Sequence, residues 1–252
     1  MNAPLTRKAA VVLAAGKGKR MKSDLPKVLH TIKGRPMIAI LLDTLVQTQF
    51  DRIIVVIGHE GEQVRAALAG YPVQFVWQRR QLGTGDAVKK TGELLGDFEG
   101  TTFVTVGDVP FLSGRSIRGL LDQHEACHAT ATCLSAIPAD PKQYGRIVRH
   151  GDSDRLEAII EYKDASEDIR SIREVNTGIF CFDNRRLFEA LDEIRNDNVQ
   201  REYYLTDVIK ILHDKGLAVH VVPVSNPDEA EGINSVEELQ NLARIFDARL
   251  SD

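Results

Sequence analysis

Glycines and basic side chains follow the first apolar segment of the chain. "KAAVVL" (8–13) has the composition of a buried strand, and Gly16, Gly18, Arg20 and Lys27 come after it. Glycine lets a backbone approach a ligand closely, and lysine or arginine neutralises negative charge. A solvated basic turn is the plainer interpretation, but the position directly after a buried strand favours a loop that binds a polyphosphate.

Two common phosphate-binding motifs do not fit this loop. The Walker pattern requires a second glycine followed by Lys and Ser or Thr, and the loop has no such run. The dinucleotide fingerprint requires a third glycine where Met21 stands. The loop therefore indicates another class of phosphate site.

The totals are ordinary for a globular protein. The 252 residues are 43% hydrophobic and 27% charged, and the formal net charge of −4 argues against a general nucleic-acid binder. Cys127, Cys133 and Cys181 lack CxxC spacing, which favours buried, reduced thiols over disulfides or a zinc site. No apolar run approaches the length of a membrane span. We expect a cytoplasmic protein with neither a nucleic-acid nor a membrane partner.

Apolar runs of strand length alternate with segments of helical spacing through the first half of the chain. Such alternation, with strands apolar on both sides, predicts an α/β fold with a Rossmann-like, mostly parallel sheet covered by helices on both faces. The expected strands are 8–13, 52–58, 73–77, 101–108 and 130–137, and the expected helices are 37–48, 62–69, 86–95 and about 115–126.

The pattern changes after Pro138. Short extended segments at 146–149, 156–160 and 174–182 are separated by turn-forming residues, which predicts a small antiparallel insertion. Helical spacing returns at 185–195 and 205–215, and a strand is expected at 217–224. A last helix begins near Ser235, which has capping-box spacing to Glu238.

Unusual residues stand at the carboxyl ends of several expected strands. They are the segment from Gly16 to Lys27, the pair Gly58-His59, the segment from Gln78 to Gly85, and the pair Gly107-Asp108. In open α/β sheets, ligands bind beyond these strand ends. We therefore expect these loops to share one binding site.

The first loop also carries a family signature. "LAAGKGKRMKSDLPKVLH" (13–30) resembles the LAAGxGxRM…PK pattern of the sugar-1-phosphate nucleotidyltransferases, and "SDLPKVLH" is most similar to the bacterial N-acetylglucosamine-1-phosphate uridylyltransferases. Further stretches match in the family's order over nearly the whole chain: "QRRQLGTGDA" (78–87), "GDVPFL" (107–112), "YGRI" (144–147), "IIEYKDA" (159–165), "EVNTGIF" (174–180), "EYYLTDVI" (202–209) and "EGINS" (231–235).

The resemblance implies an activity and a domain organisation. It implies a UDP-N-acetylglucosamine pyrophosphorylase that makes the nucleotide sugar and pyrophosphate from UTP and N-acetylglucosamine-1-phosphate with Mg²⁺. The chain would be a single nucleotidyltransferase domain over 1–252, with a nucleotide-binding half at about 1–137, a sugar-binding half at about 138–235 and a C-terminal helix at 236–252. We expect no left-handed β-helix domain, because the hexapeptide repeats that build one are missing.

The resemblance also assigns residues to the nucleotide. Lys27 would contact the phosphate under attack, whereas its plainer interpretation is a surface lysine that covers apolar surface. The base and ribose would lie against Leu13, Ala14, Ala15 and Gly16, the triphosphate against Gly18 and Arg20, and the uracil edge against Gln78, Gln81, Gly83 and Thr84.

Two oxygen ligands are implied for the metal. The resemblance gives Asp108 and Asn234 to Mg²⁺, a hard cation that takes few protein ligands beside phosphates and water. Asn234 could instead be a helix cap, because a helix is expected to follow it. His59, His124 and His128 show no ligand spacing with the cysteines, and we expect them to be structural.

The sugar would be held by Gly145, Glu161 and Asn176. Glycine leaves room for the N-acetyl group, and a carboxylate and an amide bind hydroxyls. The alternative for Glu161 is a solvated strand face.

One departure concerns the sugar: Val106 stands before the GD pair, where the family usually has tyrosine. This keeps open a uridylyl- or cytidylyltransferase for another sugar or polyol phosphate, and a non-catalytic UDP-sugar-binding homologue.

Overall fold

A computed structural model describes residues 6–21, 23–151 and 153–249. The ends of the expected single domain (1–5 and 250–252), including the last residues of the expected C-terminal helix, lie outside the described residues. No helix in the described part is long and apolar enough to cross a membrane.

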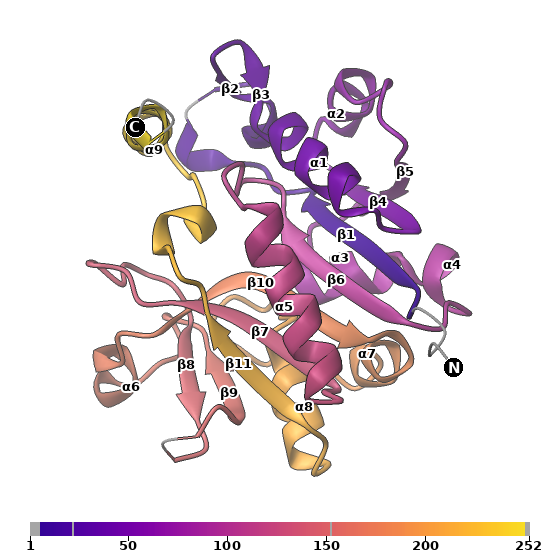
Figure 1. Cartoon of the computed structure of the whole chain (residues 1–252), viewed down its shortest axis with the longest axis vertical. Coiled ribbons are helices and arrows are strands. Elements are labelled where there is room, and N and C mark those ends of the chain that lie inside the picture. The colour runs from indigo at the N-terminus through magenta and orange to yellow at the C-terminus, as the bar shows by residue number, and fades with distance from the viewer. Residues whose placement is uncertain (1–5, 22, 152, 250–252) are drawn as a thin grey trace.

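A central sheet organises the described chain (Figure 1). Its main path has the order β11-β7-β10-β6-β1-β4-β5, and all of these strands run in one direction except β10. Their bounds are β1 (Lys8–Ala14), β4 (Arg52–Ile57), β5 (Gln74–Trp77), β6 (Thr101–Val106), β7 (Ala131–Ala136), β10 (Val175–Asp183) and β11 (Val219–Pro223).

Two hairpins accompany this path. Strands β8 (Arg146–Arg149) and β9 (Leu156–Ile160) pair with each other, and β8 joins β10 where Arg146 lies opposite Val175. Strands β2 (Thr31–Ile32) and β3 (Arg35–Pro36) form a separate two-stranded sheet. The predicted fold class, a mostly parallel α/β sheet with a small antiparallel insertion, is confirmed.

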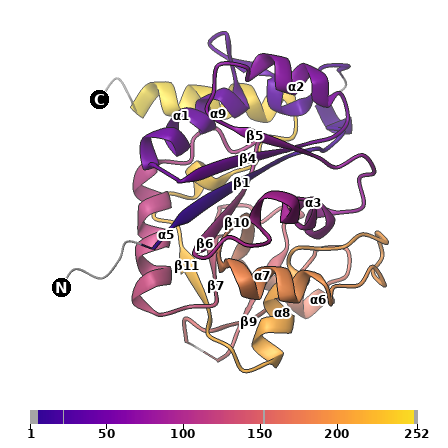
Figure 2. The ribbon, with the colours of Figure 1, turned by 90° about the vertical axis from the view of Figure 1, so that its right-hand side faces the viewer.

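Helices cover both faces of the sheet (Figure 2). The longer ones are α1 (Met37–Thr48), α5 (Gly114–Ala126) and α9 (Val236–Arg249), and the others are α2 (Gly61–Ala67), α3 (Thr84–Lys90), α4 (Gly92–Leu95), α6 (Glu167–Ser171), α7 (Asn184–Leu191) and α8 (Asp207–Asp214). The single helix expected over 86–95 is two short helices with Thr91 between them. Single 3₁₀ turns lie at η1 (Lys19–Met21), η2 (Lys27–Leu29) and η3 (Pro227–Ala230).

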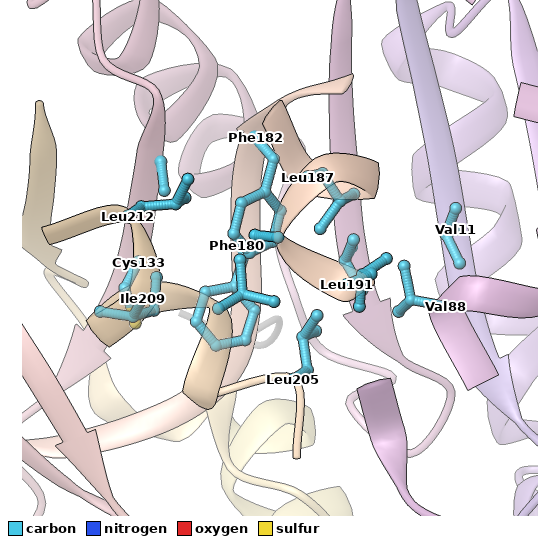
Figure 3. Close-up of a cluster of buried hydrophobic side chains, with 14 of the residues drawn as sticks. Val11, Val88, Cys133, Phe180, Phe182, Leu187, Leu191, Leu205, Ile209 and Leu212 are labelled. Atoms are coloured by element: carbon cyan, nitrogen blue, oxygen red, sulfur yellow. The ribbon is translucent and has the colours of Figure 1, made fainter. Parts of the chain in front are cut away.

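Alternate residues of β1 serve two cores, as the two-residue period of a strand requires. Ala9 and Val11 pack with α3, α7 and α8, whereas Ala10 and Val12 pack with α1, α2 and α5. Figure 3 shows the first core, in which Phe180 and Phe182 lie between the residues of α7 and α8. Burial on both faces explains why the parallel strands read as continuous apolar runs.

Helix α9 returns the end of the chain to its beginning. Leu239 and Leu242 pack with Ile32 and Met37, and Phe246 stacks on Phe111 with ring centroids 3.9 Å apart. This small third core fixes the segment just before α9, which carries Asn234. Among the cysteines, Cys133 and Cys181 are buried as expected, but Cys127 is only half-buried, and all three are free.

Candidate active site

A cleft of about 710 Å³ opens at the carboxyl edge of the parallel strands. The backbone ties the strand ends together there: Gly107 N–H donates to Leu13 O at 2.9 Å, and Gln78 N–H donates to Ile57 O at 2.8 Å. Every residue that the resemblance assigns to the nucleotide or the metal lines this cleft: Leu13, Ala14, Ala15, Gly16, Gly18, Arg20, Lys27, Gln78, Gln81, Gly83, Thr84, Asp108 and Asn234. Their roles stay predictions.

The glycine loop is shaped around Lys27. Gly18 has φ 56°, and a Cβ on it would lie 2.6 Å from the Cβ of Lys27, so the turn requires glycine. Met21, at the place of the missing third glycine, is buried, and its N–H donates to Gly18 O at 2.9 Å. The loop therefore closes as a 3₁₀ turn anchored by an apolar side chain.

Lys27 meets both of the implied metal ligands. Its ammonium group forms an ion pair with Asp108 and donates to Asn234 Oδ1 at 2.6 Å. Arg20 Nη2 donates to the same oxygen at 2.7 Å. The side chains of Lys27 and Asp108 are only 17% and 14% exposed. These polar contacts disagree with the alternative of a surface lysine that covers apolar surface.

Asn234 is not the cap of α9. The hydroxyl oxygen of Ser235 accepts from Glu238 N–H at 3.1 Å and takes the cap role. Glu238 in turn accepts from the backbone N–H of Asn234 at 2.7 Å, and Ile233 N–H donates to Asp108 O at 3.0 Å. The amide of Asn234 is therefore left to face the cleft.

One oxygen of Asp108 suits a cation. Oδ1 is buried and finds no hydrogen-bond partner in the described part of the chain, a state that costs free energy unless a ligand satisfies it. Carboxylate and amide oxygens are the donors that Mg²⁺ takes from proteins. The donor set of Asp108 and Asn234 fits the implied ion.

The base side of the cleft is built by internal contacts. Gln78 is 3% exposed, and its Nε2 donates to Gly83 O at 2.9 Å and to Asp86 Oδ2 at 2.8 Å. Gly83 has φ 115°, and any Cβ there would collide with the backbone of Tyr203. Both donors of the Gln78 amide are thus used within the loop, which leaves its oxygen for a ligand.

The three sugar-side residues lie together but do not line this cleft. Asn176 N–H donates to Gly145 O at 2.9 Å, and a Cβ on Gly145 would lie 3.5 Å from Glu161 Oε2. Thr206 Oγ1 donates to Glu161 Oε1 at 3.1 Å. Burial raises the pKa of Glu161, since desolvation and the nearby carboxylates outweigh that hydrogen bond. Glu161 is half-buried, which contradicts a solvated strand face.

Val106 lies between the nucleotide and sugar sides. It lines the cleft, and a Cβ on Gly178 would lie 3.4 Å from its Cγ1. Gly178 N–H donates to Asn176 Oδ1 at 2.9 Å. The departure from the family pattern thus adjoins the residues implied for the sugar.

Sequence reasoning did not single out four other lining residues as ligand contacts. Lys17 stands in the glycine loop, Val28 in η2 and Ala87 in α3, and Glu202 opens the stretch "EYYLTDVI". All four carried the same signal, because each lies in a stretch of the family series: Lys17 and Val28 in the first, Ala87 in "QRRQLGTGDA" and Glu202 in "EYYLTDVI". Tyr144, which flanks the sugar residues, accepts from Gly232 N–H at 3.2 Å and so joins the sugar side to the Asn234 segment.

The fold and the cleft are those of a nucleotidyltransferase. The chain belongs to the family of MobA-like NTP transferase domains, whose model matches residues 10–207. Its overall architecture is similar to a crystal structure of UDP-glucose pyrophosphorylase complexed with UDP-glucose (TM-score 0.75, 16% identity, 96% of this chain and 99% of that one).

Individual curated relatives give a more specific similarity than the family model does. The chain is 48% identical over 241 residues to the bifunctional protein GlmU of Brevibacillus brevis, and 45% identical over 243 residues to that of Enterococcus faecalis. These alignments cover 96% of this chain but 52% and 53% of the relatives, so the chain spans about half of their length. The resemblance seen in the motifs is confirmed.

Proposed function

We propose that the chain is a UDP-N-acetylglucosamine pyrophosphorylase acting on UTP and N-acetylglucosamine-1-phosphate in the cytoplasm. The observation that carries the proposal is the contact of Lys27 with both Asp108 and Asn234 beside the glycine loop. This arrangement suits a reaction in which several phosphate charges must meet. The match to the bifunctional GlmU proteins supports the uridylyl and amino-sugar substrates over other members of the class.

The chemistry would be an in-line displacement at the α-phosphorus of UTP. An oxygen of the sugar phosphate forms the new bond to the α-phosphorus. The bond between the α-phosphorus and the oxygen that bridges it to the β-phosphorus breaks, and pyrophosphate leaves with that electron pair. The attacking phosphate is already ionised at neutral pH, so no general base is required. Catalysis then depends on alignment and on neutralising charge.

The basic side chains would perform the neutralisation. Lys27 is a compact, donor-rich charge that can follow a phosphoryl oxygen into the transition state, and Arg20 offers a planar fork to the triphosphate. Both now donate to Asn234 Oδ1, so the nucleotide phosphates would compete for donors that the cleft already holds in place.

Asp108 and Asn234 would hold Mg²⁺, which when bound would supply charge neutralisation for the phosphates. The unsatisfied Oδ1 of Asp108 supports this assignment. The sugar would lie against Gly145, Glu161 and Asn176, with Glu161 as an acceptor for hydroxyl groups.

A second candidate is the same reaction with a different sugar or polyol phosphate. Val106 favours it, because an apolar side chain stands beside Gly178 where the family pattern has a phenol. A non-catalytic UDP-sugar-binding protein is the remaining alternative.

The test is pyrophosphate release from purified protein with Mg²⁺, measured for UTP and CTP against a panel of sugar-1-phosphates and polyol phosphates. We expect the highest kcat/KM with UTP and N-acetylglucosamine-1-phosphate. A higher value with another pair would select the second candidate. Binding of the nucleotide sugar without turnover of any pair would overturn the enzymatic proposal.

A further inference from the structure

Two groups of potential metal ligands lie outside the cleft, and both include residues of the β8–β9 hairpin. The first is His150, Glu157 and His213, and the second is Cys127, Asp154 and His220. In each group, one ligand atom of every residue lies within 4.8 Å of the others.

The second group has a structural explanation. His220 Nδ1 lies 3.3 Å from Asp154 Oδ2, and Cys127 Sγ accepts from Gln123 Nε2 at 3.1 Å. Asp154 O also accepts from Val221 N–H at 2.9 Å. These contacts fasten the hairpin to β11 and satisfy the side chains without an ion.

The first group has weaker internal contacts and a better donor set. His150 Nδ1 lies 3.8 Å from Glu157 Oε2, beyond hydrogen-bond distance, and the rings of His150 and His213 have centroids 6.0 Å apart. Two imidazoles and a carboxylate are a known zinc ligand set that leaves the fourth position to water. Zinc bonds of about 2.0–2.2 Å would bring the three atoms to about 3.3 Å from one another. The side chains of His150 and Glu157 are 71% and 46% exposed, so small side-chain rotations suffice.

We propose that His150, Glu157 and His213 form a binding site for Zn²⁺ or a similar divalent transition-metal ion. Imidazole nitrogen favours Zn²⁺, Co²⁺, Ni²⁺ and Cu²⁺ over Mg²⁺, which prefers oxygen. The site therefore differs in chemistry from the Asp108–Asn234 pair, and the inference does not depend on the proposed function.

The position gives the site a structural effect. Glu157 lies near the start of β9, and His213 in the last turn of α8, so an ion would join the hairpin to the helix. Figure 1 shows this part of the molecule at the end opposite β2 and β3. The other ends of β9 and α8 lead to Glu161 and Thr206 on the sugar side, about 10–13 Å away along either element. The ion would thus clamp the two elements that position Glu161, without touching the sugar.

The experiment uses the 252-residue chain after chelator treatment and dialysis, titrated with Co²⁺ and Zn²⁺. We expect one Co²⁺ per chain with the visible absorption of a tetrahedral nitrogen–oxygen site, displaced by Zn²⁺, and a Zn²⁺-dependent rise in Tm. His213→Gln and His150→Gln should each weaken binding at least about tenfold and abolish the rise in Tm. Circular dichroism of the metal-free variants verifies that they fold.

Matched variants separate the alternatives. His128→Asn removes an exposed imidazole outside both groups, at φ 45° where asparagine is tolerated, and should bind as the parent does. Thiolate-to-cobalt absorption lost in Cys127→Ser would assign the ion to the second group and overturn the proposal. Binding lost in Asp108→Asn would assign it to the cleft and overturn it equally. So would unchanged affinity in His213→Gln.

Discussion

The glycine loop on the proposed nucleotide side and the surroundings of Glu161 on the proposed sugar side carry opposite charge. The glycine loop brings Lys17, Arg20 and Lys27 to the cleft, whereas Glu161 on the sugar side lies among carboxylates that include Asp164 and Asp207. An acidic pocket accepts hydroxyl groups and repels phosphate, while a basic loop does the reverse. The difference would orient a sugar phosphate before any specific contact forms.

The two sides also differ in how they are held. Glycines that tolerate no side chain shape the nucleotide side, as at Gly18 and Gly83. The sugar side depends on hydrogen bonds between distant elements, as between Glu161 and Thr206. We therefore expect backbone substitutions to damage the first side and charge substitutions to damage the second.

The largest effect is expected where the two sides meet. Asp108→Asn keeps the shape but removes the charge that faces Lys27 and the proposed Mg²⁺, so kcat should fall about 10²–10³-fold or more. Steady-state pyrophosphate release at saturating substrates measures it. Asp97→Asn, at an exposed aspartate outside the cleft, is the control. Retention of half the parent activity in Asp108→Asn would contradict the metal assignment.

Gly83→Ala tests the backbone shaping. The substitution places a methyl group against Tyr203 at a φ that alanine disfavours, so we expect a loss of about 1–3 kcal/mol in the free energy of unfolding. Weaker UTP binding should accompany it in calorimetry. Gly16→Ala is the matched control, because no atom lies within 4 Å of the added Cβ. Its Tm should be unchanged, and equal destabilisation of both variants would argue against the backbone explanation.

Glu161→Gln tests whether Glu161 binds the sugar phosphate. Loss of a charged acceptor should raise KM for the sugar phosphate about tenfold to a hundredfold while KM for UTP changes little. The pKa of Glu161 is raised in the folded protein, so ionisation opposes folding and the parent loses stability as pH rises through that pKa. The variant should therefore unfold at higher temperature than the parent at pH 7.5, but not at acid pH. An unchanged KM for the sugar phosphate would remove Glu161 from the sugar site.

Asp207→Asn should have the smallest effect. Burial, with Asp164 and Asp197 adding to it, raises the pKa of Asp207 to about 6. The parent's free energy of unfolding thus falls as pH rises from about 4 through about 6. Because Asp207 is partly exposed, the effect of its pKa shift on stability is discounted. The free energy of unfolding of the variant should then exceed that of the parent by about 1 kcal/mol at pH 7.5, or about 2–4 °C in Tm. Thermal unfolding of parent and variant across pH checks this. A difference in Tm that appears only above pH 7 would contradict the raised pKa of Asp207 as its cause.

Periodicity and strand-end residues predicted much of the architecture from the sequence. The parallel strands, the covering helices and the cleft loops follow from local patterns, because a buried strand and its glycine turn are encoded within a few residues. The position of β10 between β6 and β7 is a matter of long-range pairing, which no local pattern specifies. The break between α3 and α4 at Thr91 was also missed.

The candidate site, too, has features that local sequence predicts and features that depend on long-range packing. Lys27 and Asp108 each follow a strand and could be placed at one edge, but the contact of Lys27 with Asn234 depends on α9 packing against the start of the chain. The hydrogen bonds of the Gln78 amide to Gly83 and Asp86 could not be predicted either, because they depend on how the loop from Gln78 to Asp86 closes. The sequence did not predict the proposed Zn²⁺ site, because His150, Glu157 and His213 are not separated by the short spacings of a metal-binding motif.

The packing of Phe246 on Phe111 has a consequence for protein synthesis. A ribosome delivers the glycine loop long before the segment with Asn234, so most of the parallel strands can form while the proposed ion site still lacks its amide oxygen. The proposed activity would then arrive abruptly, when α9 leaves the exit tunnel and packs against the folded chain. A nascent chain arrested before that moment would be folded in its first half and inert.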